Sequence, residues 1–134
     1  MPTLDINLNE VVEKPRLPAA QPFTFAIIQA TPEIAKNPNK HSGVREPQIK
    51  ATMTVVTPGW EDRKLTHYWS LAATALSSDD PAFSIKKFFQ IVGFNWSPDG
   101  KFSTEDLQTI RFEGTVKYKE GSGFPNLATV TRGA

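Results

Sequence analysis

Hydrophobic and polar residues alternate with period two along most of this chain, as they do in β-strands that bury one face. The alternation predicts strands at residues 23–30, 48–56, 65–71, 111–120 and 126–132. A polar stretch with three prolines, residues 31–47, is expected to be a long loop. In the second strand Lys50 falls on the face opposite to Ile49, and in the third strand Tyr68 falls opposite to Trp69.

The segment DPAFSIKKFFQIVGF, residues 80–94, departs from this alternation and shows helical spacing. Its hydrophobic residues recur at i, i+3, i+4 and i+7, as in an amphipathic helix: Ile85, Phe88, Phe89 and Val92. Pro81 suits the first turn, and Asp79 or Asp80 is a candidate cap. Gly93 stands where a helix commonly ends, and residues 103–107 predict one more helical turn.

The order strand, strand, strand, helix, strand, strand predicts an all-β fold with one helix between the third and fourth strands. We expect a five-stranded OB-like Greek-key barrel over residues 23–134, with the helix closing one end. Gly114 would allow a sharp bend in the fourth strand. Residues 1–22 carry four prolines and are expected to form an extended N-terminal arm. A short edge strand within that arm is the alternative.

Composition narrows the function classes. The 134 residues suit one domain, and the net charge of +1 gives no strongly basic nucleic-acid tail. The absence of Cys excludes disulfides, thiolate catalysis and Cys-ligated zinc. No signal peptide and no run of about 20 apolar residues is seen, so we expect no membrane partner and a cytoplasmic location.

Catalytic chemistry is not indicated. His41 lies in the polar loop without a second ligand at metal spacing, and His67 is expected to be hydrogen-bonded and partly buried. The adjacent acidic pairs lie in turns or at a helix start, where turn formation and capping explain them. We therefore expect no enzyme activity, no metal and no cofactor.

Binding of single-stranded nucleic acid needs cations along the backbone and aromatic faces for the bases. OB folds place such residues on strands two and three and on the loops between strands one and two and between strands four and five. The candidates in these positions, and in the turn between strands two and three that carries Trp60, Arg63 and Lys64, are Lys36, Lys40, Arg45, Lys50, Trp60, Arg63, Lys64, Tyr68, Lys117, Lys119 and Phe124. Trp60 could instead cover the barrel end, and Tyr68 could pair across strands.

Several short motifs resemble a family of small phage-encoded OB-fold proteins, related to single-stranded-DNA-binding proteins. Asp62-Arg63-Lys64 stands where that family has Gly-Arg-Lys, and Val92-Gly93 stands where its helix closes in Leu-Gly. Residues 107–116 are similar to its pattern before the fourth strand, but Thr109 and Ile110 replace a Gly and a Lys. The resemblance covers roughly residues 23–132. It implies a sequence-tolerant accessory protein of phage replication or recombination in the host cytoplasm.

Two function hypotheses follow. The first is single-stranded DNA binding by phosphate contacts and aromatic stacking, with phage replication or recombination proteins as further partners. The second is a non-enzymatic protein-interaction or virion-associated module on the same scaffold. The small net charge slightly favours the second hypothesis, whereas the cations on the loops and the resemblance favour the first. Self-association into a homo-oligomer is compatible with either hypothesis.

Overall fold

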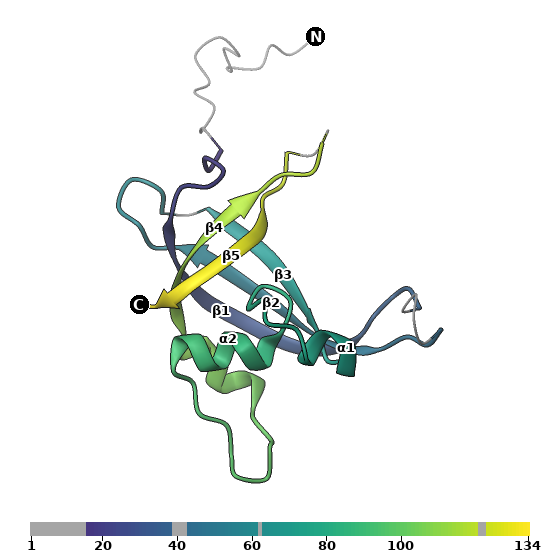
Figure 1. Ribbon diagram of the computed structural model, residues 1–134. Coiled ribbons are helices and arrows are strands. Elements are labelled where there is room, and N and C mark those ends of the chain that lie inside the picture. Colours follow the sequence, from purple (N-terminus) through teal and green to yellow (C-terminus); the bar gives the residue numbers. More distant parts are fainter. Residues whose placement is uncertain (1–15, 39–42, 62, 121–122) are drawn as a thin grey trace, which may run out of the picture.

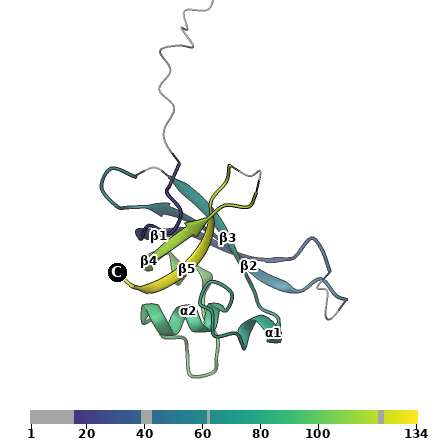
Figure 2. The same ribbon diagram turned by 45° about the horizontal axis from the view of Figure 1, so that its top comes forward.

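The computed structural model describes residues 16–38, 43–61, 63–120 and 123–134, and these residues form one antiparallel five-stranded sheet (Figures 1 and 2). Its strands follow the order β3-β2-β1-β4-β5. Their bounds are β1 Phe23–Ile34, β2 Pro47–Val55, β3 Lys64–Ser70, β4 Arg111–Lys117 and β5 Asn126–Gly133. The prediction of a mostly β chain with five strands is confirmed.

The sheet is open within the described part of the chain. Strands β3 and β5 are its two edges and are not hydrogen-bonded to each other. The sheet curves so that these edges approach one another (Figure 1). The OB-like barrel therefore stays a prediction, since closure would need pairing between β3 and β5.

Strand β1 is longer than the sequence pattern predicts. Residues 31–34 were expected to begin the loop, but they continue the strand and pair with β2, with Pro32 opposite Ile49. Among the described residues, strand β4 pairs with β1 only over residues 23–26. Residues 31–34 therefore pair with β2 on one side and with no strand on the other. Because a proline lacks the N–H that a second neighbour would need, Pro32 is tolerated there. The β1–β2 hairpin consequently projects from the body of the sheet (Figure 2).

Helix α2, Ile85–Val92, forms at the predicted helical stripe. Ile85, Phe88 and Phe89 are buried. The predicted start is wrong: Ser84 is the cap and accepts a hydrogen bond from the Lys87 backbone N–H. The predicted end is confirmed, because Gly93 adopts the left-handed conformation with φ of 77°.

The predicted caps of α2 belong to a separate turn before it. Asp80 Oδ1 accepts a hydrogen bond from the Ala82 N–H, and the Asp80 carbonyl accepts from Phe83 and Ser84. Pro81 lies inside this turn. An Asx-type turn therefore uses Asp80, because its short carboxylate reaches the backbone two residues on.

The expected count of one helix is also wrong for the described residues. A four-residue helix, α1 (Ala73–Leu76), follows β3, and its short length leaves little helical periodicity to read. The helical turn expected at 103–107 is a 3₁₀ helix, η1 (Thr104–Thr109), which buries Leu107. Both lie with α2 at one end of the sheet (Figure 1).

Aromatic rings join α2 to the sheet. The Phe88 ring lies 4.7 Å from Trp69 of β3 and 5.1 Å from Phe112 of β4, centroid to centroid. Phe89 packs on the other side against Phe94 and Phe102, which lie between α2 and η1. Each fully buried ring contributes about 1.5–3 kcal/mol, so α2 closes this end of the core.

The segment between α1 and α2 is held to edge strand β3 by two ring N–H groups. Trp69 Nε1 donates to the Pro81 carbonyl at 3.1 Å, and His67 Nε2 lies 2.6 Å from the Ala82 carbonyl. Because a carbonyl only accepts, His67 must donate from Nε2. Burial lowers the pKa of His67 below its ordinary value of 6.5. The prediction of a hydrogen-bonded, partly buried histidine is confirmed.

The end of the predicted N-terminal arm contacts the sheet where it is described. Leu17 is buried in the core, and its carbonyl accepts a hydrogen bond from the Tyr118 hydroxyl at 2.7 Å. The Arg16 guanidinium lies over the Tyr118 ring. The rest of that arm, residues 1–15, lies outside the described residues, as does His41. Among the described helices, none has the length and apolar character needed to cross a membrane.

Candidate functional site

The outward side chains of β1, β2 and β3 form a polar surface, which we call the outer face. Lys50 is the direct cross-strand partner of Tyr68 on β3 and of Thr31 on β1. Lys50 is exposed, and Tyr68 keeps 49% of its surface exposed. The two side chains lie within contact range because directly opposed Cβ atoms are about 5 Å apart. The sequence alternation predicted that both would face outward.

A bulge decides which residues β1 adds to the outer face. Before it, Phe23, Phe25 and Ile27 point into the core. The register shifts between Ile27 and Gln29, which leaves Ile28 as an extra residue at 43% exposure. Such a bulge reverses the alternation beyond it. Odd-numbered residues after the bulge, among them Glu33, consequently face outward.

A pocket of about 400 Å³ opens on the outer face at the base of the β1–β2 hairpin. Tyr68 forms one wall. Gln48 Nε2 donates a hydrogen bond to Glu33 Oε1 at 2.7 Å, and both residues line the pocket. The full lining is Glu33, Ala35, Lys36, Asn37, Gln48 and Tyr68.

Two of the three predicted hairpin cations lie close to this pocket. Lys36 lines it and is exposed. Arg45 Nε donates to the Ala35 carbonyl at 2.8 Å, which fixes Arg45 beside Lys36 across the hairpin. Lys40 lies outside the described residues. The structure therefore brings together Lys36, Arg45, Lys50 and Tyr68.

The other predicted residues lie at the opposite end of the sheet, where β1 begins. There Phe25 pairs with Val55 at the end of β2, and Phe23 pairs with Gly114 of β4. The nine residues of β2 separate the two ends by roughly 30 Å at the usual rise per residue. We call this set the hairpin-end group: Trp60, Arg63, Lys64, Lys117, Lys119 and Phe124.

Trp60 in the hairpin-end group is packed on the core. Its ring meets Phe23 edge to face at 5.6 Å, and Arg63 lies over it at 5.4 Å from the ring centroid. Only part of the ring surface is exposed. This contact favours the alternative in which Trp60 covers the end of the core, and base stacking by Trp60 stays a prediction.

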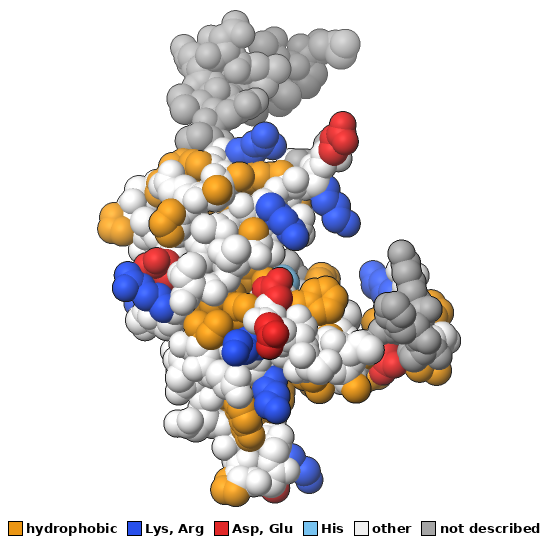
Figure 3. Space-filling model, in the orientation of Figure 1, with side chains coloured by type: hydrophobic (Ala, Val, Ile, Leu, Met, Phe, Trp, Pro, Cys, Tyr) orange, Lys and Arg blue, Asp and Glu red, His pale blue; other side chains and the backbone are white. Residues whose placement is uncertain are grey.

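Lys64 and Phe124 line a separate pocket of about 290 Å³ between β3 and the β4–β5 hairpin. Lys117 and Lys119 are exposed on that hairpin. Lys and Arg side chains on the surface seen in Figure 3 are separated from one another and interspersed with Asp and Glu. Because β2 separates the two ends of the sheet, the predicted cations that the structure describes form two groups rather than one continuous track.

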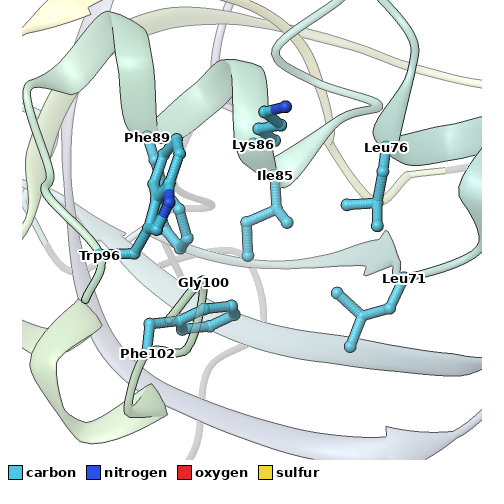
Figure 4. Close-up of a pocket in the computed structure, with 8 residues that line it drawn as sticks. All are labelled: Leu71, Leu76, Ile85, Lys86, Phe89, Trp96, Gly100 and Phe102. Carbon is cyan, nitrogen blue, oxygen red and sulfur yellow. The ribbon is translucent and has the colours of Figure 1, made fainter. Parts of the chain in front are cut away.

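An apolar pocket of about 300 Å³ lies beneath α2 (Figure 4). Apart from Gly100, its lining consists of hydrophobic side chains and Lys86 at the rim: Leu71, Leu76, Ile85, Lys86, Phe89, Trp96, Gly100 and Phe102. Trp96 is half-buried in one wall and packs against the core. The alternation gave no sign of this pocket, because its walls come from a helix and irregular segments.

Glu33, Gln48 and Asn37 were not singled out from the sequence. The signal available was the alternation of Gln29, Thr31 and Glu33, which continues past Ala30 to Ile34. Pro32 within this run favoured a loop. Groups of three or more potential metal-binding His, Asp or Glu side chains do not occur among the residues described.

The chain matches no family model, and comparisons with curated proteins and with solved structures find no match. The resemblance to small phage-encoded OB-fold proteins therefore stays an expectation drawn from short motifs.

Proposed function

We propose that this protein binds single-stranded DNA on its outer face, as a non-enzymatic accessory protein of phage replication or recombination. The observation that carries the proposal is the pairing of Lys50 with Tyr68, next to a pocket lined by Lys36. A half-exposed aromatic ring flanked by cations is the combination that single-stranded nucleic acids need. Tyr68 would stack on a base, and Lys36 and Lys50 would contact phosphates.

The proposal includes an OB-like architecture. Strands β4-β1-β2-β3 lie in the spatial order of a Greek key. Helix α2 follows β3 and precedes β4, and it covers one end of the core. OB folds are partly open barrels that bind nucleic acid on strands two and three. The outer face includes both of those strands together with β1, which supports the assignment.

The direct test is a fluorescence-anisotropy titration of labelled oligothymidine at several salt concentrations. Affinity should fall as salt rises, with a log–log slope of about −0.7 for each phosphate neutralised. A Lys36→Glu/Lys50→Glu variant should bind more weakly and give a flatter slope. The single variants Lys36→Glu and Lys50→Glu are compared with Lys86→Glu as the matched control. Each of the three makes the same charge change, and Lys86 lies on α2, outside the outer face.

Two results would contradict the proposal. One is wild-type protein without salt-sensitive binding at low ionic strength. The other is an equal loss in Lys86→Glu and in the single variants Lys36→Glu and Lys50→Glu, which would indicate a general charge effect.

The apolar pocket beneath α2 favours a second candidate, a protein-interaction module. Exposed apolar pockets commonly receive a partner's hydrophobic side chain. The anionic dye anilinonaphthalene sulfonate is a suitable probe, since its aromatic body fits apolar walls and its sulfonate matches Lys86. Dye binding by wild type that is lost in Leu76→Glu, but kept in the exposed-site variant Ile34→Glu, would support this candidate.

A further inference from the structure

The pocket on the outer face is bordered by an aromatic ring and by a hydrogen-bonded carboxylate–amide pair. Glu33 and Gln48 are register partners on β1 and β2. Ser70 is the β3 partner of Gln48, so Tyr68, two residues earlier, is the diagonal neighbour on the same face. An aromatic ring and a carboxylate–amide pair therefore border one hollow of about 400 Å³.

The Glu33–Gln48 hydrogen bond fixes how the Gln48 amide is oriented toward Glu33. A carboxylate only accepts, so Gln48 must turn its NH₂ group toward Glu33 at 2.7 Å. Gln48 Oε1 is then directed away from Glu33. Among the described residues, Glu33 Oε2 and Gln48 Oε1 have no hydrogen-bond partner. The pair consequently offers acceptor oxygens to a ligand beside Tyr68.

Bases differ in what they present to such acceptors. Cytosine and adenine carry an exocyclic amino group, whereas thymine carries carbonyl oxygens on either side of its one N–H. A carboxylate accepts well from the cytosine N4 amino group. The same carboxylate would repel the thymine carbonyl oxygens. The ring of Tyr68 accepts any base by stacking, so selection falls to Glu33 and Gln48.

We propose that this pocket seats one base that bears an exocyclic amino group, stacked on Tyr68 and hydrogen-bonded to Glu33 and Gln48, and that it disfavours thymine. The inference rests on the proposed single-stranded DNA binding and adds a base preference to it. Lys36, which also lines the pocket, would hold the phosphate next to the seated base.

The test compares labelled oligodeoxycytidine and oligothymidine of equal length, at mildly alkaline pH and fixed salt. Wild type should bind the cytidine strand about tenfold more tightly, the size expected for one good base contact. Glu33→Gln should bind both strands equally, because Gln can turn a donor toward thymine. Glu105→Gln on η1 removes one charge outside the lining of this pocket and should keep the preference.

The outcomes separate this inference from the proposed function. Salt-sensitive binding of wild type with equal affinity for both strands overturns the base preference and leaves DNA binding intact. A preference that survives in Glu33→Gln also overturns it. No binding of either strand overturns both proposals. If Glu33→Gln has a lowered melting temperature, Gln48→Met provides the second variant. It removes one acceptor and the hydrogen bond that orients Glu33, so the preference should become smaller, and an undiminished preference would overturn the inference.

Discussion

The indole N–H of Trp69 donates a hydrogen bond to the carbonyl of Pro81, and this contact joins edge strand β3 to the segment that leads into α2. Trp69 is fully buried, and its ring also packs against Phe88 of α2. One side chain therefore fixes both the start and the middle of the α2 region against the open edge of the sheet.

Trp69→Phe should lower the free energy of unfolding by about 1–3 kcal/mol, because the Pro81 carbonyl loses its donor inside the protein. Trp96→Phe is the control, since no partner for its indole N–H occurs in the described part of the chain. Its loss should stay below about 1 kcal/mol. Urea unfolding of both variants measures the difference, and equal losses would show that the hydrogen bond contributes nothing.

His67 should make stability depend on pH. Burial lowers its folded pKa below 6.5, while the Ala82 hydrogen bond and Asp80 oppose this and Lys117 adds to it. The unfolded chain then binds more protons than the folded one, so stability is complete above pH 6.5 and falls as pH drops through the folded pKa.

Urea midpoints between pH about 7.5 and about 5 measure this fall, and His67→Gln should reduce it because the titrating group is gone. An unchanged pH profile in His67→Gln would contradict the assignment.

Phe88→Ala should cost about 3–5 kcal/mol, because its ring fills the space between Trp69 and Phe112. Phe83→Ala, at a ring that is 61% exposed, should cost far less. Denaturant unfolding compares the two. A loss below about 1 kcal/mol for Phe88→Ala would show that α2 does not close the core.

Gly114→Ala should destabilise the sheet by about 1–3 kcal/mol or more, because a Cβ there would overlap the Thr129 carbonyl of β5. The ladder is already irregular at this point, with a register shift between Glu113 and Gly114. Gly123→Ala is the control, since its Cβ meets no described atom within 4 Å. Thermal melting that ranks the two variants in the reverse order would contradict this packing.

Tyr68→Ala should reduce binding, whereas Trp60→Ala should reduce stability. Tyr68→Ala should weaken oligonucleotide binding by about 1–3 kcal/mol, with the salt slope and the melting temperature nearly unchanged. Trp60→Ala should lower stability by about 2 kcal/mol, because its ring packs on Phe23. Anisotropy and melting of each variant test the pair. Strong binding loss in Trp60→Ala at full stability would place the stacking surface at the hairpin-end group.

Local pattern predicted much of the fold. The alternation along β2 and β3 correctly places Lys50 and Tyr68 outward, because successive residues of any strand face opposite sides. Helical spacing likewise depends only on neighbours three and four residues apart, and the predicted α2 stripe is buried at Ile85, Phe88 and Phe89 and partly buried at Val92. The start of α2 was missed, because Ser84 and Asp80 are both capable caps and only the turn at residues 80–84 decides between them.

The sequence by itself determined the number and order of the strands, the buried face of α2 and the polar character of the outer face, all of which follow from repeats within a few residues. Tertiary structure alone decided the bulge at Ile28, the grouping of Glu33 and Gln48 with Tyr68, and the separation of the outer face from the hairpin-end group. These depend on strand register. Register is set by pairing between residues far apart in the chain, and a shift of one residue exchanges the two faces of a strand.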